Sequence, residues 1–91
     1  MMNYGVEADD SQRFMKKSVA REMRSTIVFI QRCLDQGIAS GEFKPADTAV
    51  LAQVIFCAIE GAIVVSRVKG SPAPMAAVVT HCRSVLDHLT S

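Results

Sequence analysis

Imidazole groups are common metal ligands and thiolates are strong nucleophiles, and this 91-residue sequence has two histidines and three cysteines. Cys82 directly follows His81, and neighbouring residues on a helix point about 100° apart, so this pair cannot form a nucleophile–base dyad. His81 and His88 share a helix face but lie two turns, or roughly 10 Å, apart, which is too far for one metal ion. The sequence therefore predicts no catalytic residue, no metal site and no cofactor.

The three cysteines, Cys33, Cys57 and Cys82, each lie in an apolar context with helical periodicity. An odd number of cysteines without close spacing fits neither a disulfide framework nor a zinc site. The N-terminal segment is acidic and has no apolar stretch typical of a signal peptide. We therefore expect buried, reduced thiols in a cytoplasmic protein.

Glu60 is the other side chain that could bind a ligand. The residues three and four positions away on a helix are all apolar, so none can pair with it; they are Phe56, Cys57, Ile63 and Val64. Three interpretations remain open. Glu60 reaches solvent along a narrow polar stripe, pairs with a basic residue on another helix, or points into a ligand cavity.

The helix that carries Glu60 is predicted from Thr48 to about Lys69, with Asp47 as its N-cap. Gln53, Glu60 and Arg67 lie seven residues apart and form one narrow polar stripe, while most of the remaining surface is apolar. This helix must be covered on most of its sides. A membrane span is disfavoured because Glu60 would lie near its centre, at a cost of about 2.5–3.5 kcal/mol.

Two further helices are predicted. Residues 1–8 are expected to be a frayed N-terminus, and residues 9–91 a single helical domain that begins with a cap at Asp9, Asp10 or Ser11. The first helix runs to about Ile38 and is closed by Gly41. A third helix follows Gly70, has a proline in its first turn and continues to Leu89.

The first helix carries an apolar stripe and, opposite to it, a basic stripe. The apolar residues are Val19, Met23, Ile27, Ile30 and Leu34, and the basic residues are Arg13, Lys17, Arg21, Arg24 and Arg32. No aromatic residue is expected among these basic side chains, and Glu22 dilutes them. With a net charge of +1 for the whole chain, the basic stripe is interpreted as a solvated face, and no specific DNA binding is expected.

These elements predict an all-α fold of three antiparallel helices joined by short turns. The apolar surface of the second helix exceeds what one chain can cover. A second copy would cover it if the last two helices of each chain formed a four-helix bundle. The residues predicted at this homodimer interface are Ala58, Gly61, Ala62, Val65, Val78, Cys82, Val85, Leu86 and Leu89.

The sequence resembles the C-terminal regulatory domain of TetR/AcrR-type transcriptional regulators. The resemblance covers roughly Arg21 to Leu89 and rests on Ser40-Gly41-Glu42-Phe43, on Asp47 before a long apolar helix, and on Ile59-Glu60-Gly61-Ala62 within it. It implies a homodimeric four-helix bundle. It also implies that the first two helices form part of a pocket for a small hydrophobic effector, with candidate residues Ile27, Ile30, Phe56, Ile59, Glu60 and Ile63.

Members of this family begin with a helix-turn-helix DNA-binding domain, and the pattern of that motif does not occur in these 91 residues. The sequence is thus expected to be the non-enzymatic effector-binding and dimerisation part of such a regulator. The alternative is a stand-alone helical adaptor whose apolar helix binds a helix of a different protein.

Overall fold

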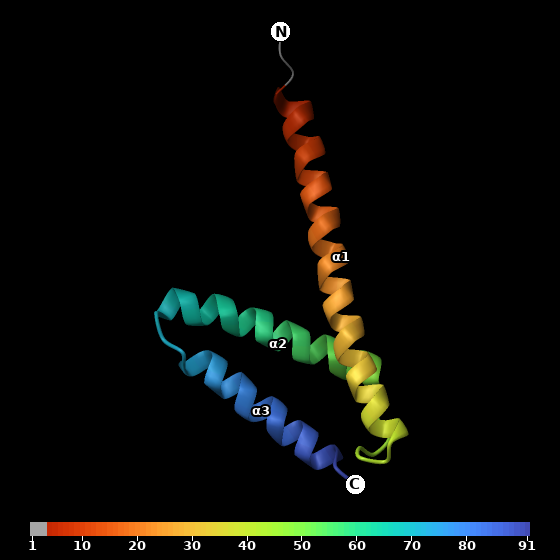
Figure 1. The fold of residues 1–91 in the computed structure, drawn as a ribbon. Helices are drawn as coiled ribbons and strands as arrows, with labels where there is room; N and C mark the ends of the chain where they lie inside the picture. The colour runs from red at the N-terminus through yellow and green to blue at the C-terminus, as the bar shows by residue number, and fades with distance from the viewer. Residues whose placement is uncertain (1–3) are drawn as a thin grey trace.

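Three helices make up the part of the chain that the computed structural model describes, residues 4–91, with side chains described from residue 9 onward. Helix α1 spans Tyr4–Ala39, α2 spans Thr48–Lys69 and α3 spans Ala73–Leu89 (Figure 1). Within residues 4–91 no strand is formed, and β-type pairing is limited to one bridge between Phe43 and Thr90. The predicted all-α class is confirmed.

Local capping signals set the bounds of α2 as the sequence predicts. The Asp47 carboxylate accepts a hydrogen bond of 3.2 Å from the backbone N–H of Val50, which satisfies one of the free donors at the helix start. At the other end Gly70 has a φ of 62°, in the left-handed region, and its N–H returns to the carbonyl of Arg67. Both predicted caps are confirmed.

Helix α1 is longer than the sequence patterns indicate. The helix start predicted at Asp9, Asp10 or Ser11 was wrong, because α1 already begins at Tyr4. No proline interrupts residues 4–11, so the helix continues through the potential capping residues. Residues 1–3 of the predicted frayed segment lie outside the described residues. The predicted end is confirmed: α1 stops at Ala39, and Gly41 follows with a φ of 81°.

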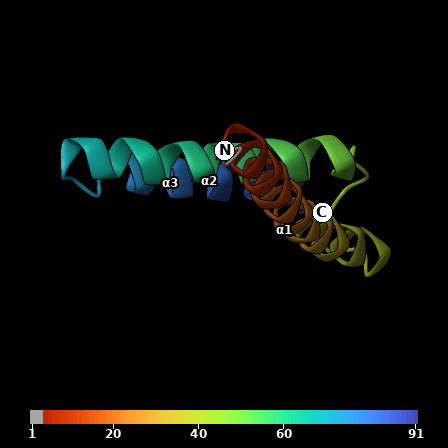
Figure 2. The same ribbon diagram turned by 90° about the horizontal axis from the view of Figure 1, so that it is seen from above.

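The helices pack pairwise. Helix α3 folds back beside α2, whereas α1 crosses the first part of α2 and its N-terminal half projects away from both (Figures 1 and 2). The C-terminus is tied to the turn after α1 by two backbone hydrogen bonds. Lys44 N–H donates to the Leu89 carbonyl (2.6 Å), and Ser91 N–H donates to the Glu42 carbonyl (3.0 Å). These two bonds hold the C-terminal end of α3 against the turn between α1 and α2.

A small polar cluster joins α1 to the start of α2. The Thr48 hydroxyl, which is buried, donates a 2.6 Å hydrogen bond to the Asp35 carboxylate and accepts one of 3.5 Å from the Gln31 amide. One turn further on, the Ala52 side chain is fully buried at 0% exposure. A side chain this small lets two helices approach closely, so this crossing positions α1 relative to α2.

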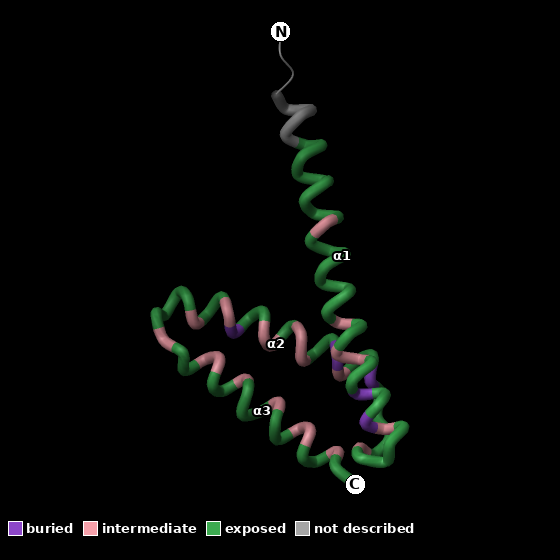
Figure 3. The backbone as a smooth tube through the Cα atoms, viewed as in Figure 1, coloured by how far each residue is buried: buried purple, intermediate pink, exposed green. Residues whose placement is uncertain are grey.

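The interior of the single chain is very small. The buried apolar side chains are Leu34, Ala52 and Ala62, and most of the residues from 9 to 91 are exposed (Figure 3). The radius of gyration is 18.0 Å, against about 12 Å for a compact domain of this length. The Cα atoms extend over 66 × 33 × 13 Å, so the molecule is long and flat.

Phe43 packs its ring against α1 at Gly37. A Cβ atom at position 37 would lie 2.2 Å from Cδ2 of that ring, much closer than a normal contact. We expect Gly37→Ala to lower the free energy of unfolding, because overpacking costs about 1–3 kcal/mol while the gain in helix propensity is about 1 kcal/mol at most. Urea denaturation measures this difference.

The Phe43→Ala variant provides the control for Gly37→Ala. In a Phe43→Ala background no ring opposes the new methyl group, so Gly37→Ala is expected to stabilise the chain. If Gly37→Ala stabilised both backgrounds equally, the close approach of Phe43 would not be what requires a glycine at this position.

Candidate functional site

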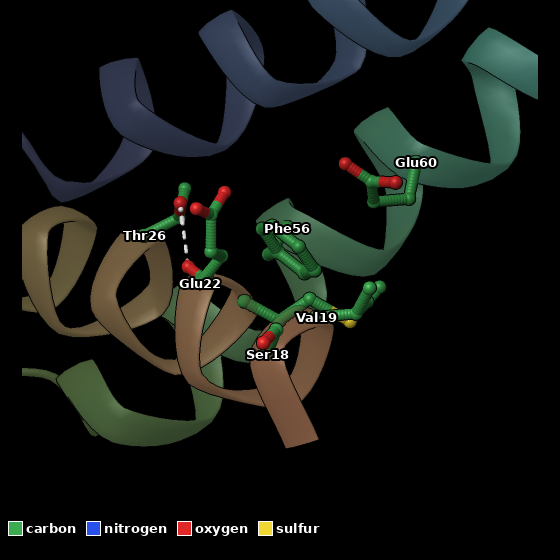
Figure 4. A pocket seen from close by; sticks show the side chains of 7 residues that line it. Ser18, Val19, Glu22, Thr26, Phe56 and Glu60 are labelled. Carbon is green, nitrogen blue, oxygen red and sulfur yellow. Dashed lines mark hydrogen bonds between the residues drawn. The ribbon is translucent and has the colours of Figure 1, made fainter. Parts of the chain in front are cut away.

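A cavity of about 360 Å³ opens between the middle of α1 and the middle of α2 (Figure 4). Its walls combine apolar side chains, hydroxyl groups and two carboxylates. Five residues come from α1 and two from α2: Ser18, Val19, Glu22, Met23, Thr26, Phe56 and Glu60. This volume falls in the range of pockets that hold small organic molecules.

The α1 residues share one face because they recur with helical spacing. Val19 and Met23 belong to the apolar stripe of α1, and Glu22 and Thr26 follow at positions one turn apart. The Thr26 hydroxyl donates a 3.1 Å hydrogen bond to the backbone carbonyl of Glu22, so its proton is already used within the helix. The free polar atoms facing the cavity are therefore mainly carboxylate oxygens.

The residues proposed from sequence for a ligand pocket do not all lie together. Phe56 and Glu60 line this cavity. Ile30 lines a second cavity of about 300 Å³ beside Phe43, and Ile59 lines a third, of about 260 Å³, between α2 and α3. Ile27 and Ile63 are half-buried and line none of the three.

The sequence interpretation missed Glu22 as a lining residue. From the sequence alone, Glu22 is only a charge that dilutes the basic stripe of α1. The available signal was its position between Val19 and Met23, since residues three and four apart lie on neighbouring parts of a helix face. What the pattern alone could not show is that α2 crosses α1 near this point.

Two of the three interpretations of Glu60 agree with the structure. Its side chain is exposed and lines the α1–α2 cavity, so the solvent and cavity interpretations both describe it. Among the described side chains the salt bridge found is that of Arg13 with Asp10, on the surface of α1. Pairing of Glu60 with a basic residue of another helix therefore does not occur among the residues described.

A second surface lies on α2, on the side that neither α1 nor α3 covers. We call it the α2 outer stripe. From Val50 to Val64 its members are spaced alternately by four and three residues, as in helices that pack along their length, and Val65 and Val68 continue the same face. They are Val50, Val54, Cys57, Gly61, Val64, Val65 and Val68, all exposed in the single chain.

The outer stripe faces away from α1 for a simple geometric reason. Ala52 is fully buried at the crossing with α1, and Val54 follows two residues later, about 160° away around the helix. Val54 is accordingly 58% exposed. Beside the stripe, α2 and α3 form a shallow groove of about 280 Å³, lined by Ala58, Ala77, Val78, His81 and Cys82.

The interface residues proposed from sequence do not all lie on the outer stripe. Gly61 and Val65 belong to the outer stripe, and Ala58 lines the adjacent groove. Ala62 is buried, and the α3 residues are half-buried within the single chain; they are Val78, Cys82, Val85, Leu86 and Leu89. Much of the apolar arc of α3 is thus already in use within the chain.

The thiols and imidazoles do not come together. The expectation of buried thiols was wrong for Cys33 and Cys57, which are exposed because they lie on helix faces that the single chain does not cover; Cys82 is half-buried. The His88 ring bonds the Ser84 carbonyl through Nδ1 at 2.8 Å. Within the described part of the chain, no three His, Cys, Asp or Glu side chains form a group that could hold a metal ion.

The basic face of α1 differs from its sequence interpretation in one respect. Arg21, Arg24 and Arg32 line a broad groove of about 520 Å³, and the same groove includes Phe29, which is 67% exposed. The expectation that no aromatic side chain lies among these arginines was wrong. Phe29 follows Ser25 by one turn, at the edge between the apolar and basic stripes.

Helix α2 is long and apolar enough to cross a membrane by length and composition, with a mean hydropathy of 2.1 over an 18-residue window. Only 17% of that window is buried within the single chain. One helix of this kind is weak evidence for a membrane span, since core helices of soluble proteins have the same properties. The finding does show that α2 presents apolar surface that something else must cover.

A comparison with protein families shows that the model described as tetracyclin repressor-like, C-terminal domain, matches residues 1–82. The match extends further towards the N-terminus than the resemblance seen in the sequence, and it includes all of α1 and α2 and about half of α3. No curated protein and no solved structure matches the chain.

Proposed function

The chain belongs to the family of tetracyclin repressor-like C-terminal domains, and we propose that it is the effector-binding and homodimerisation domain of a TetR-like transcriptional regulator. The proposal includes a cytoplasmic location and a role in binding rather than catalysis. Two surfaces support it: the cavity between α1 and α2, and the outer stripe of α2.

The observation that carries the proposal is the excess of exposed surface. The single chain exposes 7070 Å², whereas a folded monomer of 9.9 kDa typically exposes about 5,200 Å². The difference, roughly 1,900 Å², is larger than the approximately 800 Å² that each partner buries in a standard protein–protein interface. A second copy packed on the outer stripe in an interface of standard size would remove about 800 Å² of this excess from each chain.

The proposed dimer is a four-helix bundle of α2, α3 and their symmetry mates. Gly61 on the outer stripe and Ala58 in the adjacent groove between α2 and α3 are both small, so a partner helix could approach closely there. The valines of the outer stripe would supply apolar area, at about 25 cal/mol per Å² buried. A two-fold axis would bring the outer stripe of one copy against the outer stripe of the other. Each apolar surface would then be covered by another apolar surface.

The other ways of covering α2 fit the residues less well. A lipid environment would have to accommodate Gln53, Glu60 and Arg67, which follow one stripe along the whole helix, and a charged residue near the bilayer centre costs about 2.5–3.5 kcal/mol. An adaptor that binds a helix of another protein would use the same outer stripe. The oligomeric state of the purified chain separates the adaptor from the homodimer.

Sedimentation equilibrium on the 91-residue chain tests the proposal. At micromolar concentration we expect a species of twice the chain mass of 9.9 kDa, because the outer stripe needs a partner. A folded monomer over this concentration range would contradict homodimerisation. Such a monomer would favour the adaptor instead.

A further inference from the structure

One imidazole lies on the surface that the second copy is proposed to cover. His81 is exposed in the single chain and lines the shallow groove of about 280 Å³ between α2 and α3, beside Ala58. Ala58 follows Val54 by four residues and precedes Gly61 by three, so the groove continues the face of the outer stripe. In a bundle of α2, α3 and their mates, a partner packed against Gly61 therefore also covers the rim of the groove that carries His81.

The groove brings no carboxylate or further cation to His81 from either helix. The other groups that line it are apolar side chains and the Cys82 thiol. On α2, Glu60 lies two residues after Ala58, about 160° around the helix, and lines the cavity towards α1 instead. On α3, Arg83 lies about 160° from His81 and lines the cavity on the other side of the helix. Within the described residues, α1 packs against α2 and not against α3.

The second imidazole of α3 has different surroundings. His88 lies in the last turn of α3 and outside the groove, and its Nδ1 donates a 2.8 Å hydrogen bond to the Ser84 carbonyl. A carbonyl only accepts hydrogen bonds, so this bond exists whether the ring is neutral or protonated. The end of a helix also favours positive charge. Charged residues in this part of the chain are Asp87 on α3 and Glu42 and Lys44 in the turn that bonds to its end.

From this contrast we propose that His81 makes homodimerisation pH-dependent, so that the dimer forms while the imidazole is neutral and weakens when it takes up a proton. The inference rests on the homodimer proposed above and adds its regulation. An imidazolium ion that a partner covers loses its hydration, and the apolar groove supplies no carboxylate in return. Because a two-fold axis repeats the surface, each dimer carries this cost twice.

The pH range of the effect follows from the ordinary behaviour of histidine. An exposed imidazole is half protonated near pH 6.5, so at about pH 5.5 roughly one free chain in ten keeps it neutral. If only these chains dimerise, the dimerising form falls about tenfold for each copy, and the dissociation constant rises about a hundredfold. Ordinary carboxylates titrate below about pH 5 and thiols above about pH 8, outside the range compared.

Sedimentation equilibrium of the 91-residue chain at about pH 7.5 and about pH 5.5, at equal ionic strength, tests the inference. We expect the dissociation constant to be about a hundredfold larger at the lower pH. His81→Gln stays neutral at both pH values and should reduce this change to less than about threefold. His88→Gln is the matched control on the same helix and should keep the full change. Circular dichroism at both pH values distinguishes dissociation from loss of the helices.

The outcomes separate this inference from the homodimer on which it rests. A dimer with the same dissociation constant at both pH values would refute the role of His81 and leave homodimerisation supported. A pH dependence that persisted in His81→Gln, or that disappeared only in His88→Gln, would refute it as well. A chain that was monomeric at both pH values would contradict the homodimer itself, and the proposed role of His81 would fall with it.

Discussion

Replacing Val65 with glutamate is expected to dissociate the proposed homodimer. Val65 lies on the outer stripe of α2 and is 43% exposed in the single chain. In the bundle each copy would bury an unpaired carboxylate, at a cost of about 3–5 kcal/mol. Two such costs per dimer should raise the dissociation constant at least about a thousandfold, which sedimentation equilibrium measures directly.

The control places a glutamate on α1 instead of α2. Arg21→Glu changes the basic face of α1, which does not contribute to the proposed bundle, and should leave the dimer intact. A dimeric Val65→Glu together with a monomeric Arg21→Glu would move the interface to α1. Val85→Glu should also disrupt the dimer, but Val85 is already half-buried within its own chain, so its effect would combine unfolding with dissociation.

Leu34→Ala is expected to lower the free energy of unfolding by about 2–5 kcal/mol. Leu34 is 6% exposed and is the one large side chain among the buried apolar residues described. Its loss leaves a cavity among the apolar side chains that line the same pocket, which include Ile30, Phe43 and Ile55. Urea denaturation at a fixed chain concentration measures the change, since the stability of a dimer depends on concentration.

Phe14→Ala serves as the comparison for Leu34→Ala. Phe14 is larger than leucine but is 73% exposed near the free end of α1. Its removal should change the free energy of unfolding by less than about 0.5 kcal/mol. Equal effects of the two substitutions would show that the interior lies elsewhere than at the crossing of α1 and α2.

The positions of the helices follow from short-range interactions, and the sequence therefore predicts them well. Asp47 needs only the N–H group of Val50 to cap α2, and Gly41 and Gly70 need only their own freedom to adopt a positive φ. The start of α1 is the exception. Several consecutive residues there can serve as a cap, and local preferences do not exclude a longer helix.

The sequence predicted only some of the residues that line the candidate cavity. Phe56 and Glu60 were anticipated because they stand out on a helix that is otherwise almost entirely apolar. Glu22 was not, because its role depends on where α2 crosses α1, and that crossing is made by Ala52 and Thr48 against residues of another helix. Helical periodicity places a residue on a face but does not say which element lies opposite.

What the sequence determined by itself is that α2 has more apolar surface than a chain of 91 residues can bury. That conclusion depends only on composition and on a period of 3.6 residues. The tertiary structure decided which part of this surface stays uncovered. Helix α3 occupies one side and α1 crosses a second, so the valines from Val50 to Val68 remain exposed. The packing partners of a helix are fixed by contacts between residues far apart in the sequence, which no local pattern encodes.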